Sequence, residues 1–124
     1  MKLSKCKKLL AVTSMAALVG SVTAFADTYI NENFADGYGK YMLDVNSSSG
    51  MRSCDACAWG SNEYDYNVKL ITVYSDGQEV VRETGFTAGS ARITSSYEWA
   101  EDYQAFMAVR DGIEIKDKVW VSGS

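Results

Sequence analysis

The stretch "YDYNVKLITVY" at residues 64–74 decides the fold class, because apolar side chains occupy every second position from Tyr64 to Leu70. This period of two is typical of a β-strand with one buried face. An Asp-Gly pair at 76–77 follows, and this dipeptide suits the positive φ angles of a two-residue hairpin turn. The run "EVVRETGF" (79–86) then returns, so the sequence predicts an antiparallel β-hairpin.

A second hairpin is predicted near the C-terminus, where "DYQAFMAVR" (102–110) is followed by an Asp-Gly pair and by "IEIKDKVWV" (113–121). A helix over 96–110 is the competing interpretation. Ser95 and Glu98 have the spacing of a capping box, and large apolar residues then recur at helical spacing. We favour the hairpin, because pairing the two runs sorts apolar and charged side chains onto different sides.

Further short strands fit the remaining chain. Candidates are "TYINENF" (28–34), "YGKYMLDVNS" (38–47) and "SARITSSYE" (90–98). Six or seven short strands separated by turn signals predict an all-β fold, namely a small antiparallel β-sandwich or barrel.

Residues 1–26 read as a secretory signal peptide. Four lysines precede a short apolar run, and "AFA" at 24–26 is a small-x-small cleavage site. The run is shorter than the roughly 20 residues that span a bilayer, so we expect cleavage rather than stable membrane insertion. The sequence thus predicts a secreted protein with a single mature domain at 27–124.

The charge of the chain changes at the predicted cleavage site. The 16 acidic residues all follow it, whereas four of the 12 basic residues precede it, which leaves a net charge of about −8 on the mature part. Nucleic acids and anionic membranes require a positive surface for counterion release, so neither is an expected partner.

The segment "SSSGMRSCDACAWGSN" (47–62) is rich in serine and glycine and is predicted to be a long surface loop. It carries Cys54 and Cys57, a spacing shared by metal sites, redox centres and local disulfides. The mature part has no histidine and no other cysteine, so a structural zinc site lacks ligands. Export favours oxidation, and we therefore expect a Cys54–Cys57 disulfide that closes a short loop.

The same lack of histidine removes the usual general base of serine and cysteine hydrolases. Carboxylate pairs remain as an enzymatic alternative, but no spacing singles out one pair. Asp44 and Asn46 are oxygen ligands for calcium, yet they lie outside any known loop pattern. We therefore expect neither an enzyme nor a bound metal or cofactor.

Aromatic residues are the more suggestive feature, with 8 tyrosines and 3 tryptophans in the chain. Their rings supply binding area at a low entropy cost. With Asp111 and Gly112 as a two-residue turn, Tyr103 opposes Trp120 on the charged side of the final hairpin. The candidate ligand-binding residues are Tyr103, Lys116, Lys118 and Trp120.

These observations support a small secreted module that binds a protein or a glycan. The order of a secretion signal, an all-β region and late aromatic strands resembles that of secreted β-sandwich bacteriocins of the lactococcin type. An antagonistic factor is therefore the second hypothesis, although no motif matches residue by residue. A small carboxylate enzyme or an enzyme inhibitor is the third.

Overall fold

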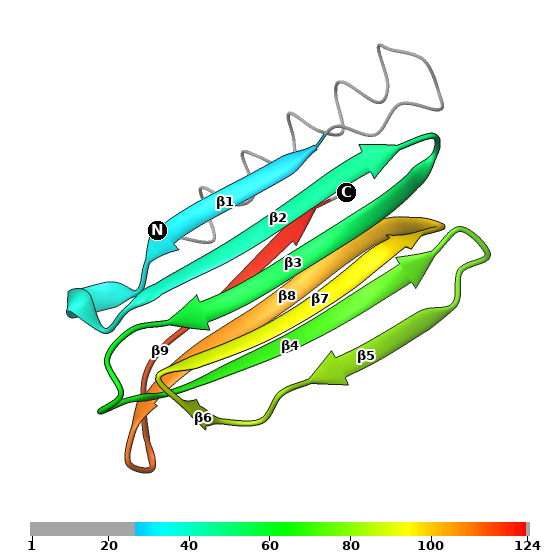
Figure 1. The fold of residues 1–124 in the computed structure, drawn as a ribbon. Helices are drawn as coiled ribbons and strands as arrows, with labels where there is room; N and C mark the ends of the chain where they lie inside the picture. Colours follow the sequence, from blue (N-terminus) through cyan, green and yellow to red (C-terminus); the bar gives the residue numbers. More distant parts are fainter. Residues whose placement is uncertain (1–26, 124) are drawn as a thin grey trace.

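The computed structural model describes residues 27–123, which form two stacked antiparallel β-sheets (Figure 1). The predicted signal peptide lies outside the described residues. Sheet A has the order β1-β2-β3-β7, and sheet B has the order β5-β4-β8-β9 with the short β6 paired to β4. The bounds are β1 Thr28–Asn33, β2 Lys40–Ser48, β3 Met51–Trp59, β4 Asp65–Tyr74, β5 Glu79–Glu83, β6 Thr87–Ala88, β7 Ser90–Glu98, β8 Ala100–Asp111 and β9 Glu114–Gly123, with a 3-10 turn at Ala35–Gly37.

The all-β prediction is confirmed, and of the two predicted architectures the structure has the sandwich. Both sheets remain open, with β1 and β7 as the edges of sheet A and β5 and β9 as the edges of sheet B, so the barrel is wrong. Within residues 27–123, no helix is long and apolar enough to cross a membrane.

The core lies between the sheets and is built by the alternating positions of both. Tyr66, Val68 and Leu70, on which the strand prediction rested, are fully buried there. Across the sandwich, β4 approaches β7 and β3 of sheet A. The largest fully buried apolar side chains are Phe34, Tyr41, Leu43, Val45, Tyr66, Val68, Leu70, Tyr103, Met107, Val109 and Val121.

The segment 47–62 is not a loop for most of its length, because Met51–Trp59 forms strand β3 in the middle of sheet A. A tight turn at Ser49 and Gly50, both with positive φ, joins it to β2. The prediction failed because the inward-facing residues of β3 are arginine, cysteine and alanine, which give a weak apolar pattern.

The segment 96–110 is extended, so the helical alternative is wrong. The chain leaves sheet A at Glu98 and enters sheet B at Ala100, with Trp99 between them. Trp99 therefore lies at the point where the chain passes from β7 in sheet A to β8 in sheet B. The spacing that resembled a helix combines residues of two strands with different partners.

The register of the final hairpin differs from the predicted one. The turn residues are Gly112 and Ile113, and a bulge between Val109 and Arg110 adds one residue to β9. Moving the turn by one residue changes each β8–β9 partner by two positions, so each residue keeps a partner on the predicted face of the sheet. The bulge changes the partners by one further position, so each residue beyond it pairs with a residue predicted to lie on the other face. Trp120 consequently pairs with Phe106 instead of Tyr103.

Candidate functional site

A groove of about 440 Å³ lies on the outer face of sheet B, across β4, β8 and β9. Two adjacent cross-strand rows build it. The first row joins Lys69, Phe106 and Trp120, and the second joins Asn67, Ala108 and Lys118. The small side chain of Ala108 rises little above the sheet in the middle of the second row. A hollow therefore forms there, beside the rings of Phe106 and Trp120 in the first row.

The two rings of the groove are neighbours on the sheet surface. The centroids of Phe106 and Trp120 are 6.4 Å apart, and their planes are inclined by 40°. The Phe106 side chain is 40% exposed, which is high for a large apolar residue in the middle of a sheet. Trp120 is partly buried, and its indole Nε1 has no hydrogen-bond partner among the described residues.

Two ammonium groups flank the rings. The Nζ atom of Lys69 lies 5.9 Å from the centroid of Phe106, a cation–π distance. In the part of the chain that the structure describes, no carboxylate forms an ion pair with Lys69 or Lys118. Glu83 is the cross-strand neighbour of Lys69, but its carboxylate accepts a hydrogen bond of 2.9 Å from the amide of Asn67.

The structure brings together two of the four predicted ligand-binding residues. Trp120 and Lys118 both line the groove. Tyr103 faces the core and is fully buried, so the predicted facing of its ring is wrong. Lys116 pairs with Glu114 and lies 5.9 Å from the ring centroid of Tyr38, away from the groove.

Sequence reasoning missed Phe106, Lys69 and Asn67. The predicted register placed Trp120 on the side of Tyr103, and Phe106, three residues after Tyr103, then falls on the other side of the hairpin. Lys69 and Asn67 reach the groove through the pairing of β4 with β8, which joins distant parts of the chain. The alternation in β4 places both residues on its outer face, but it does not identify the strand beside them.

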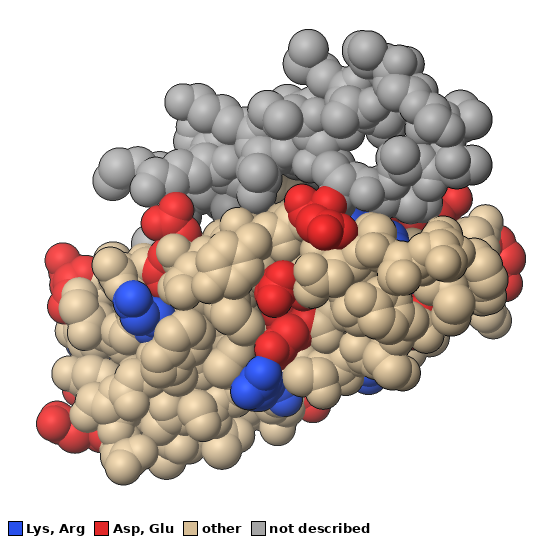
Figure 2. Space-filling model, turned by 45° about the horizontal axis from the view of Figure 1, so that its top comes forward, with Lys and Arg blue, Asp and Glu red and all other residues tan. Residues whose placement is uncertain are grey.

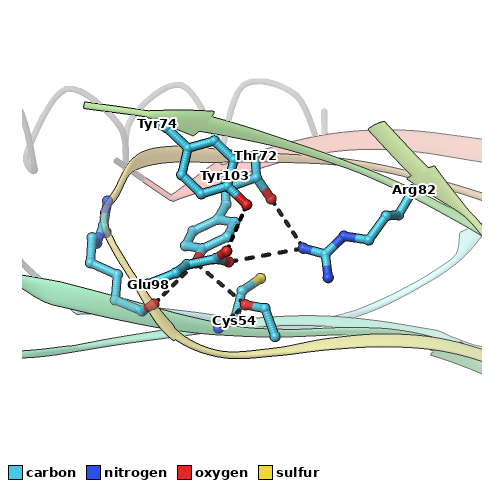
Figure 3. A network of polar contacts seen from close by, with 8 residues as sticks. Cys54, Thr72, Tyr74, Arg82, Glu98 and Tyr103 are labelled. Carbon is cyan, nitrogen blue, oxygen red and sulfur yellow. Dashed lines mark hydrogen bonds and ion pairs between the residues drawn. The ribbon is translucent and has the colours of Figure 1, made fainter. Parts of the chain in front are cut away.

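A second cluster of polar groups surrounds Glu98, at the edge of the sandwich where β7 faces β4 and β5 (Figure 3). The phenol of Tyr74 donates to Glu98 Oε1 at 2.7 Å, and that of Tyr103 lies 2.8 Å from Oε2. Arg82 approaches from β5, with Nη2 4.0 Å from Oε2 and 3.2 Å from the hydroxyl of Thr72.

The cluster raises the pKa of both phenols. The hydrogen bond to Glu98 raises the pKa of Tyr74, and burial is the main cause of the raised pKa of Tyr103. Both phenols therefore remain protonated donors near neutral pH. The Glu98 carboxylate has two phenol donors and a nearby cation, an arrangement that joins the two sheets.

The outer face of sheet A carries a pair of carboxylates beside the exposed ring of Tyr29. Asp44 and Asp55 are directly opposite each other on β2 and β3, and Figure 2 shows acidic side chains gathered in a row across the visible face. Arg92 Nε donates to Asp55 at 2.9 Å, and Asn46 donates to Asp44 at 3.2 Å. The calcium alternative rested on Asp44 and Asn46. Within residues 27–123 no three acidic or cysteine side chains gather in a metal-binding arrangement.

The predicted Cys54–Cys57 disulfide is wrong, because both cysteines are free thiols on strand β3. Residues three apart in a strand point to opposite faces, and their Cα atoms are about 10 Å apart, beyond the roughly 7 Å that a disulfide allows. Cys54 is buried in the core, and burial raises the pKa of its thiol to about 12. Cys57 lies on the outer face, where partial burial also raises its thiol pKa.

Alkylation of the native protein is expected to modify Cys57 slowly and to leave Cys54 unmodified. The reactive form is the thiolate, which is scarce when the pKa is raised, and the Cys54 thiol is also inaccessible. Iodoacetamide treatment at about pH 8, followed by fragment mass spectrometry, locates the label. Both residues should react after denaturation without a reducing agent. If neither cysteine reacts in the denatured protein until a reducing agent is added, the two cysteines form a disulfide after all.

Comparisons of this chain with protein-family models, with curated proteins and with solved structures find no match.

Proposed function

We propose that this protein is a secreted binding module that holds its ligand in the groove on the outer face of sheet B. The observation that carries the proposal is the hollow of about 440 Å³ beside the exposed Phe106 and Trp120 rings. Its volume falls within the roughly 300–1,000 Å³ of ligand pockets. Secretion rests on the sequence of residues 1–26 alone.

The groove has the chemistry of binding rather than of proton transfer. It offers ring faces for an apolar surface, ammonium groups for charge and the amide of Asn67 for a hydroxyl. Its lining residues include no carboxylate, thiol or histidine that could serve as a general base. The carboxylate held by Tyr74 and Tyr103 lies in the separate cluster at the sandwich edge.

Replacing Trp120 with alanine is expected to weaken ligand binding at least about tenfold, since aromatic residues carry much of the energy of such sites. The free energy of unfolding should fall by no more than about 2 kcal/mol, because the ring is only partly buried. A glycan array and a pull-down with residues 27–124 identify ligands, and calorimetry then compares the variants.

Trp99→Ala is the matched control, because this tryptophan is 58% exposed and lies outside the groove lining. Phe106→Ala should reproduce the loss seen with Trp120→Ala. Binding that survives both groove substitutions but is abolished by Trp99→Ala would contradict the proposal.

A further inference from the structure

We infer that the ligand of the groove is an acidic carbohydrate, a glycan that contains uronic acid. This inference rests on the proposed function and names the class of ligand. It is carried by one juxtaposition: Lys69 lies at one end of the row of the two rings, and Lys118 lies in the adjacent row. Neither lysine forms an ion pair within residues 27–123.

The rings suit the face of a sugar. The C–H groups of a pyranose present an apolar surface that packs on an aromatic ring, and Phe106 is 40% exposed to such packing. The inclination of 40° between Phe106 and Trp120 gives a twisted platform rather than a flat one. Successive sugars along a glycan are rotated relative to one another, so a twisted platform can contact adjoining rings.

The ammonium groups select for a carboxylate. Lys69 Nζ is 5.9 Å from the centroid of Phe106, so the carboxylate of a pyranose packed near that ring can reach this cation. Lys118 lies on the other long side of the groove, beyond Ala108. A glycan with more than one uronic acid can therefore pair with both, whereas a neutral glycan offers no anion to either.

The surrounding charge makes these two lysines distinctive. Residues 27–124 carry 16 acidic and 8 basic side chains, so most of the surface repels an anion. Beside the groove, Arg110 is paired with Asp65, and Glu83 is held by Asn67. At physiological ionic strength charges act over about 8 Å, so carboxylates beyond this range are screened. Glu83 lies beside Lys69, so an acidic ligand is favoured only where it contacts the ammonium groups directly.

Asn67 supplies a further polar contact. Its Nδ2 donates one hydrogen to Glu83 at 2.9 Å, and its Oδ1 lies 3.3 Å from the hydroxyl of Thr84. An amide nitrogen has two hydrogens, so one remains for a ligand oxygen. Position 67 lies in the same row as Lys118, across Ala108. A sugar hydroxyl over the hollow can therefore accept this hydrogen while the ring packs on Phe106.

The test compares oligomers of galacturonate, glucuronate and mannuronate with their methyl esters, in which the same rings are uncharged. Calorimetry measures each against the mature protein. We expect the acids to bind at least about tenfold more tightly than the esters, and to bind more weakly when NaCl rises from about 50 to about 300 mM. Lys69→Gln and Lys118→Gln together should remove the preference for the acids.

Lys40→Gln is the control, because it removes the same charge from an exposed position on β2 in sheet A. The inference is overturned if the esters bind as tightly as the acids, or if Lys40→Gln weakens the acids as much as the groove variants do. It is also overturned if a different ligand binds through Trp120 while no uronate does; the proposed function then stands. If Trp120→Ala alters the binding of no ligand on the array, both fail.

Discussion

Replacing Tyr103 with alanine is expected to lower the free energy of unfolding by about 3–5 kcal/mol. The whole domain is stabilised by only about 5–15 kcal/mol, so this loss is a large fraction of its total stability. Tyr103 is 0% exposed and lies on the inner face of β8. The substitution removes a buried ring and also one of the two phenols that donate to Glu98.

Tyr103→Phe separates the two contributions. The ring stays in place, and only the hydroxyl near Glu98 Oε2 and the carbonyl oxygen of Arg52 is lost. Leaving a charged acceptor short of a donor costs about 1–3 kcal/mol, so this variant should lie between wild type and Tyr103→Ala. Urea denaturation followed by circular dichroism gives all three values.

Tyr97→Ala is the control for a tyrosine near the same sheet crossing, because its side chain is 48% exposed and lies outside the core. It should change stability by less than about 1 kcal/mol. Equal effects of Tyr97→Ala and Tyr103→Ala would show that Tyr103 is not part of the core. The contrast with Trp120 is direct, since Trp120→Ala is expected to alter binding and Tyr103→Ala folding.

The sequence predicts the fold class because the strongest alternating runs lie where the sandwich is best defined. Strand β4 is buried on one face along nearly its whole length, and it pairs with both β5 and β8. Its apolar alternation is therefore a consequence of its central position. Strand β3 is equally central, but Arg52 and two alanines occupy its inner face. Small and charged residues do not produce an apolar alternation, so the sequence does not predict this strand.

The candidate site is predicted only in part, for two physical reasons. No residue pattern in β9 indicates the bulge, yet the bulge decides which residues of β8 lie on the same face of the sheet as Trp120. The contact between Lys69 and Phe106 depends on the pairing of β4 with β8, which no local pattern specifies. Trp120 and Lys118 were nevertheless found, because they alternate with buried valines on a single strand.

Replacing Gly39 with alanine is expected to destabilise the protein by roughly 2–5 kcal/mol. Gly39 has φ of +134°, a region that residues with a side chain rarely adopt. A Cβ at this position would lie 2.5 Å from the carbonyl oxygen of Trp59 and 2.6 Å from the phenol oxygen of Tyr66. Both strain and overpacking therefore oppose the substitution.

Neither neighbour of Gly39 can move freely. Trp59 is the β3 partner of Lys40 in the terminal pair between β2 and β3, so shifting its carbonyl disturbs the ladder. The Tyr66 phenol donates a hydrogen bond of 2.6 Å to the carbonyl oxygen of Tyr38, and its ring is fully buried. To relieve the clash, the protein would have to lose either the Lys40–Trp59 strand pair or the hydrogen bond from Tyr66 to Tyr38.

Gly37→Ala is the matched control, because Gly37 has φ of +74° but no atom within 4 Å of the added Cβ. It carries the conformational strain of about 1–2 kcal/mol without the clash. Chemical denaturation of the two variants measures the difference. If Gly39→Ala costs no more than Gly37→Ala, the close approach of β2, β3 and Tyr66 is not a constraint on the fold. If it costs more, the excess measures the clash of the added Cβ with Trp59 and Tyr66, together with the difference in backbone strain between the two positions.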